Sequence, residues 1–132
     1  MRTLWDSVIA RLQDGVDAGS LQPIQDREQV MRGQFGEMPM RAPFVFVYLE
    51  PGRTITIGGP TGLNEYTCTI FCGAAPEDSS PETVITAVEM AHRCADLIDG
   101  LGPQFPENPI AIDTVHADFA AVRLTAFLTD HE

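Results

Sequence analysis

The residues best suited to chemistry lie in one short stretch, which runs from Asp113 to Asp118 and contains His116. Aspartate and histidine are suitable ligands for metal ions, so this stretch could form a small metal site. In a regular strand, however, Asp113 and His116 point to opposite faces, because successive side chains alternate. We therefore predict a polar strand end without a bound metal. A small ligand- or metal-binding domain that uses Asp113 and His116 stays open as an alternative.

The other reactive residues do not combine into a site. Cys68 and Cys72 lie in a strand-like run, roughly 13 Å apart at about 3.3 Å per residue, too far for a disulfide or a shared metal. His92 and Cys94 diverge on a helix, and the odd number of cysteines favours a reduced, intracellular setting. Residues 58–62 are rich in glycine, but they lack the lysine of a phosphate-binding loop. We therefore predict no enzymatic activity, no metal and no cofactor.

The charge balance excludes two classes of function. The chain has 132 residues, with 19 acidic and eight basic side chains and a net charge of −11. Such an acidic chain lacks the basic patch that grips nucleic acid. The longest uncharged apolar run, residues 42–49, is far too short to span a membrane. Every basic residue is arginine and lysine is absent, which favours a GC-rich genome of a bacterium or a phage.

The first half of the chain predicts a helix, an arm and a meander of strands. Apolar residues at helical spacing predict the helix over residues 3–16. Residues 21–43 have several prolines and glycines and poor periodicity, which predicts an extended arm or binding loop. Within this arm, residues 26–31 could form a helical turn or a short strand. Three antiparallel strands are predicted over residues 44–49, 54–57 and 65–73, joined by a type II turn at 50–53 and a hairpin tip at 58–62.

The second half predicts one more helix and two more strands. A capping signal at residues 79–82 starts the helix, which ends near Gly100. The apolar stripe predicted to face the sheet comprises Val84, Val88, Ala91, Ala95 and Ile98. Residues 110–116 and 118–129 predict the last two strands. The order α-βββ-α-ββ predicts a single α+β domain over residues 1–132, with a mostly antiparallel sheet and two helices packed on one face.

Charge is distributed unevenly along the chain. Residues 1–50 hold five arginines and seven acids, whereas residues 51–132 hold three arginines and twelve acids. The arm is therefore nearly balanced, and the body of sheet and second helix is strongly negative. An acidic body with arginines on an arm suits assembly into a ring or filament, because the arm of one copy can meet the body of the next. An acidic surface that serves only solubility is the alternative interpretation.

The order of elements resembles the tail-terminator, or tail-completion, proteins of long-tailed bacteriophages. The resemblance rests on the amphipathic helix, the long arm, the FVFVYL strand, the hairpin, the EYTCTIFC strand, the helix after PETV and the final strand. It implies a homo-oligomer, a hexameric ring at the head-proximal end of the tail tube. Such a ring stops tube polymerisation and joins the tail-tube protein to the head–tail connector protein. DNA passes through its lumen without specific binding, and no membrane is involved. The resemblance also implies assembly in the bacterial cytoplasm and a final location in the virion.

Two candidate contact surfaces follow from this interpretation. Arginine and methionine are both enriched at interfaces, so the predicted contact between subunits comprises Arg27, Arg32, Met38, Met40 and Arg41. The predicted contact with the tube or connector comprises Gly58, Gly59, Pro60, Thr61 and Gly62. Another phage neck, minor tail or tube protein remains an alternative function.

Overall fold

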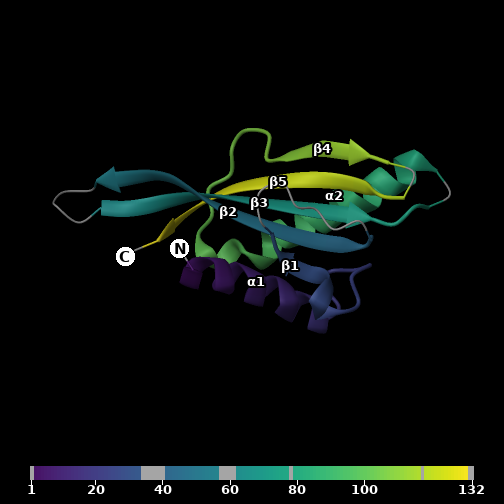
Figure 1. Ribbon diagram of the computed structural model, residues 1–132, viewed down its shortest axis with the longest axis horizontal. Helices are drawn as coiled ribbons and strands as arrows, with labels where there is room; N and C mark the ends of the chain where they lie inside the picture. Colours follow the sequence, from purple (N-terminus) through teal and green to yellow (C-terminus); the bar gives the residue numbers. More distant parts are fainter. Residues whose placement is uncertain (1, 34–40, 57–61, 78, 117, 131–132) are drawn as a thin grey trace.

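The computed structural model describes residues 2–33, 41–56, 62–77, 79–116 and 118–130. Two helices, α1 and α2, and five strands make up the domain, and two short 3₁₀ helices, η1 and η2, join them (Figure 1). In chain order the elements are α1 Arg2–Asp17, η1 Arg27–Gln29, β1 Val30–Arg32, β2 Phe44–Thr56, β3 Gly62–Ala74, α2 Ser80–Leu97, η2 Asp99–Leu101, β4 Ile110–Val115 and β5 Ala120–Asp130.

The five strands form a single sheet in the order β1-β2-β3-β5-β4, so β1 and β4 lie at its two edges (Figure 1). The pairs β2–β3, β3–β5 and β4–β5 are antiparallel, whereas β1 pairs with β2 in parallel. The predicted α+β class is therefore confirmed. The sheet is mixed rather than mostly antiparallel, because residues 30–32, predicted within the arm, add a parallel edge strand.

The first part of the predicted arm is packed against the domain. Leu21 and Ile24 are fully buried, and Val30 is nearly so. Asp26 caps η1, because its side chain accepts a hydrogen bond from the backbone of Glu28. Residues 26–31, for which the sequence leaves a helical turn and a short strand as alternatives, contribute to both, since η1 is followed directly by β1. Buried aliphatic side chains, rather than a periodic pattern, hold these residues in place.

The predicted turn at residues 50–53 is wrong. Strand β2 continues through Pro51, and its register against β3 shifts between Pro51 and Arg53. Such an irregularity lets a proline stay in a paired strand, since it relieves the need for a regular ladder. β3 is as long as β2, so the cross-strand pairing overrides the local turn signal. Residues 58–61 of the predicted hairpin tip, and residue 57 of the strand predicted before it, lie outside the described residues, and Gly62 begins β3.

The main core lies between one face of the sheet and both helices. Aliphatic residues of α1 and alternate residues of β2, β3 and β5 enter it, and the predicted alternation from Val122 to Leu128 is confirmed. α2 buries a face that is rotated from the predicted stripe and comprises Thr83, Ala87, Met90, Ala91, Cys94 and Ile98. Val84, Val88 and Ala95 are only half-buried. The helix therefore carries more apolar surface than the sheet covers.

The opposite face of the sheet carries a second, smaller apolar group. We call this group the aromatic cluster, and it comprises Phe44, Phe46, Tyr48, Phe119 and Ala121. Its rings meet edge to face, with Phe46 and Tyr48 centred 5.2 Å apart. Further along the same face lie Glu50 of β2, Thr67 of β3, and Thr125 and Phe127 of β5. The described part of the chain thus forms two layers, with both helices on one side of the sheet.

Candidate functional site

Asp113 and His116 lie on the same face of the sheet, opposite the helices. A register shift between Ile112 and Thr114 breaks the alternation that predicted opposite faces. Asp113 Oδ1 lies 4.0 Å from Nη1 of Arg123, and the His116 ring stacks on Phe119 of the aromatic cluster with centroids 5.5 Å apart. Each polar group is therefore engaged separately. Within the described ranges no three His, Cys, Asp or Glu side chains come together to hold a metal ion.

All three cysteines are buried, and the contact between two of them is a feature that the sequence did not indicate. Cys72 on β3 and Cys94 on α2 place their sulfur atoms 3.8 Å apart, and both thiols are free. Burial raises the pKa of Cys68 to about 12. A hydrogen bond with Cys72, together with burial, raises the pKa of Cys94 well above its ordinary value. Neutral, buried thiols are poor nucleophiles, so this group serves packing rather than chemistry.

Two of the predicted contact arginines fasten residues 21–32 to α1. Arg27 Nη1 lies 3.1 Å from Oδ2 of Asp17. Arg32 pairs with Asp6 and places its guanidinium carbon 4.8 Å from the ring centroid of Trp5. These contacts explain why two arginines occur in a segment with little helical or strand pattern. A role between subunits stays a prediction for both.

Arg41 differs from Arg27 and Arg32. It is exposed, and within the described residues it makes no hydrogen bond or ion pair. Met38 and Met40, which the same predicted surface contains, lie outside the described residues. Of the predicted contact with the tube or connector, only Gly62 falls within the described part. The structure therefore describes one exposed, unengaged cation of the predicted subunit contact.

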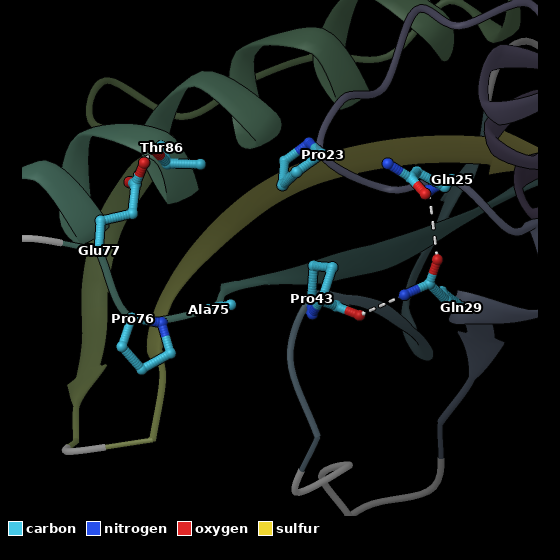
Figure 2. A pocket seen from close by; sticks show the side chains of 8 residues that line it. All are labelled: Pro23, Gln25, Gln29, Pro43, Ala75, Pro76, Glu77 and Thr86. Carbon is cyan, nitrogen blue, oxygen red and sulfur yellow. Dashed lines mark hydrogen bonds between the residues drawn. The ribbon is translucent and has the colours of Figure 1, made fainter.

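A hollow of about 380 Å³ opens where the start of α2 meets the segments on either side of β1 (Figure 2). It is lined by Pro23, Gln25, Gln29, Pro43, Ala75, Pro76, Glu77 and Thr86. The side-chain amide of Gln29 donates to the carbonyl oxygen of Pro43 at 3.1 Å, and its oxygen accepts from the backbone N–H of Gln25 at 3.2 Å. Gln29 thus bridges two chain segments at the rim, as Figure 2 shows.

The chemistry available in this hollow is limited. Glu77 is the one ionisable residue among its described lining side chains, and its carboxylate accepts a hydrogen bond from Thr86. Three prolines present apolar ring faces, so the hollow suits an apolar group better than a reaction. A neighbouring hollow of about 630 Å³ shares Gln25, Gln29 and Pro43 with it and also contains Arg41. Sequence reasoning missed both hollows, because the segments that form them are far apart in the chain.

The face and edges of the sheet offer larger surfaces. On the face opposite the helices, Thr67 and Thr69 of β3 lie in register with Phe127 and Thr125 of β5. Glu50 of β2 lies in register with Thr67. At the β4 edge, Ile112 and Val115 are exposed. This face and this edge are large enough to contact other molecules. Among the described residues, they do not bring several reactive side chains together at one point.

None of the described helices has the length and apolar character of a membrane span. The chain was also compared with known proteins. No protein-family model matches it, and no curated protein matches it significantly.

Proposed function

We propose that the chain is a structural subunit of a bacteriophage tail, a tail terminator that forms a hexameric ring at the head-proximal end of the tail tube. The ring stops tube growth and joins the tail to the head connector, and DNA passes through its lumen. In this role the protein is assembled in the bacterial cytoplasm and remains in the virion. It needs neither enzymatic activity nor a cofactor.

The observation that carries this proposal is the sheet with helices on one face only. Both helices share a single core with that face. The middle of the other face carries threonines and carboxylates, including Thr67, Thr125 and Glu50. Polar side chains of this kind favour a face that meets water, as in antiparallel sheets that are packed on one side. In a ring, the helices would lie outside, and the other face, which carries these polar side chains beside the aromatic cluster, would line the channel.

The charge distribution supports the same arrangement. Residues 51–132, which supply β3, α2, β4 and β5, hold twelve acids and three arginines. Several of these acids lie on α2, outside the channel, but Glu65 of β3 and Asp113 of β4 lie on the sheet face that would line it. Carboxylates on the channel wall repel the DNA backbone, so DNA slides through without binding. The nearly balanced residues 1–50 form α1, β1 and most of β2. Neighbouring copies can therefore meet without strong repulsion, provided that the nearly balanced part of one copy faces the acidic part of the next.

A second candidate is another neck, minor tail or tube protein. The observation that favours it is the pair of sheet edges, at β1 and β4, that no strand of the described residues covers. Head-to-tail contacts through two different edges generate a ring when the rotation between copies closes, and a filament when it does not. An open sheet is therefore compatible with a tube subunit as well as with a terminator.

Deletion of the gene from the genome that encodes it tests the proposed function. Loss of a terminator should give headless tails of variable and excessive length in electron micrographs, and the intact gene supplied in trans should restore normal particles. Antibody against the protein should label the head-proximal end of the tail in those restored particles. Particles with tails of uniform length and attached heads after deletion would contradict the proposal.

A further inference from the structure

The outer side of β4 is an open sheet edge. β4 pairs with β5 on one side, and no described strand pairs with the other. The carbonyl oxygen of Pro109 accepts from the N–H of Thr125 at 2.8 Å, so Pro109 turns toward β5. Backbone groups alternate between the two sides of a strand, so Ile110 and Ile112 turn theirs away from β5. These groups can pair with a strand from another molecule.

Exposed aliphatic side chains lie along the same edge. Ile112 is 62% exposed and Val115 is 55% exposed. Ile112 is in register with Val122, and Val115 with Ala120. The shift between Ile112 and Thr114 therefore puts both exposed side chains on the helix side of the sheet.

The half-buried flank of α2 continues this apolar surface. On one flank of α2, Arg93 donates to the carbonyl oxygen of Gln22 at 2.7 Å, and this flank faces α1. Val84 and Val88 lie on the opposite flank, toward β4, which contacts α2. We call Val84, Val88, Ile112 and Val115 the β4 shelf. The shelf thus combines the unpaired backbone edge of β4 with the apolar side chains of α2 beside it.

Strand directions indicate which edge of a second copy fits. β1 runs parallel to β2, and three successive antiparallel pairings from β2 through β3 and β5 to β4 make β4 run opposite to β1. If a second copy lies beside the first with its sheet in the same sense, its β1 meets β4 in antiparallel orientation. Antiparallel pairing is the slightly more stable kind. A β1 edge is therefore suited to the β4 edge of a neighbour.

Charge distinguishes this arrangement from a symmetric one. Asp113 lies on β4, 4.0 Å from Arg123, and the exposed Asp118 lies just after the strand. Two β4 edges placed together would bring like charges close, which is unfavourable. At the β1 edge, Arg27 and Arg32 are already paired with aspartates of α1, whereas Arg41 nearby is exposed and makes no ion pair within the described residues. An edge that carries carboxylates is thus matched to an edge with one available arginine.

We propose that the β4 shelf docks the β1 edge, Val30–Arg32, of a second copy of this chain. This inference deepens the proposed function and rests on it for the closure of the contacts into a ring. The contact itself can be tested on the purified protein. It is heterologous, since each copy offers β4 to one neighbour and β1 to the other.

Lysine substitutions on the shelf test the contact. Ile112→Lys and Val115→Lys place a charge on the open edge, a change that natural edge strands use to prevent pairing. Ile85→Lys is the matched control, because Ile85 is 56% exposed on α2, outside the shelf, and gains the same charge. Sedimentation velocity should show self-dissociation constants raised about tenfold or more by each shelf substitution. The Ile85→Lys protein should associate like the unchanged chain, and equal effects of all three substitutions would overturn the proposal.

Cross-linking of mixed variants tests which edges meet. Ile112→Cys and Arg32→Cys proteins are purified separately and treated with a short bismaleimide, alone and as a mixture, while the native cysteines are protected by burial. Cross-linked dimers in the mixture, well above the level in either protein alone, support the proposal. Dimers of Ile112→Cys alone would indicate a symmetric β4 contact and overturn it. A chain that never self-associates overturns the docking surface too, while gene deletion decides the proposed function independently.

Discussion

Replacement of Gly73 by alanine should destabilise the protein, because the added methyl group would overlap with the aromatic ring of Phe44. Gly73 on β3 is directly opposite Phe44 on β2. An added Cβ would lie 2.2 Å from Cε2 and 2.3 Å from Cζ of Phe44. The Phe44 ring is fully buried and packs edge to face on Phe119, with centroids 5.7 Å apart. The ring therefore has little freedom to move away.

The expected cost is about 1–3 kcal/mol in the free energy of unfolding, the range for inserting a methyl group into a packed core. Urea unfolding measures it, and the single tryptophan is a convenient probe because Trp5 Nε1 donates to the carbonyl oxygen of Val47 at 3.2 Å. Gly15→Ala is the control. Its Cβ would meet the methyl carbons of Leu97, which can rotate, and loss of a helix glycine is worth up to about 1 kcal/mol in the opposite direction.

A double-mutant cycle decides whether the ring is the cause. Phe44→Leu removes the atoms that the new Cβ would meet, so Gly73→Ala should lose at least half of its cost in that background. An undiminished cost with leucine at position 44 would refute the steric argument. A Gly73→Ala protein as stable as the unchanged chain would refute it as well.

Three further predictions concern the thiols, a helix cap and an exposed arginine. Because burial raises the pKa of Cys68 from 9.0 to about 12, the folded protein keeps a proton that the unfolded chain loses. The contribution of this thiol to stability should be intact below pH 9.0 and fall by at most about 1 kcal/mol per pH unit above it, less steeply in Cys68→Ala, as urea unfolding at several pH values can show. Ser79→Ala removes the side chain that accepts from the N–H of Glu82, and should cost about 0.5–2 kcal/mol in urea unfolding. Arg32→Ala removes a half-exposed ion pair and a contact over Trp5, so thermal unfolding should show a loss of only about 1 kcal/mol.

Elements with strong local signals could be predicted from the sequence. The start of α2 at Ser79 is such a case, since the side chain accepts from Glu82 as the capping signal requires. Alternation from Val122 to Leu128 also predicts correctly which side chains face the core. In both cases the information lies within a few consecutive residues.

Features that depend on distant partners could not be predicted. β1 has three residues and exists because β2 lies beside it. Pro51 carries a turn signal, but pairing with β3 keeps it in a strand. The shift next to Asp113 likewise reverses the face that the residues after it occupy, and so brings His116 to the same face as Asp113. Each depends on a neighbouring strand that local sequence does not reveal.

The same difference between local signals and distant partners applies to the candidate surfaces. The sequence predicts that the arginines of the arm contact a neighbouring subunit, which stays a prediction, and it does not reveal their contacts within the chain. Arg27 and Arg32 make such contacts within the chain. The β4 shelf depends on the packing angle of α2, which leaves Val84 and Val88 half-buried. An apolar stripe alone does not reveal which of its sides the sheet leaves uncovered.

The proposed function and the proposed docking surface both require identical copies to assemble into a closed ring. Native mass spectrometry of the purified protein tests this assembly most directly, because it counts the 14.4 kDa chains in each complex. We expect a discrete hexamer that is lost in the Ile112→Lys protein and kept in the Ile85→Lys protein. A chain that remains monomeric at every concentration, or that grows into complexes without a fixed number of copies, would contradict it.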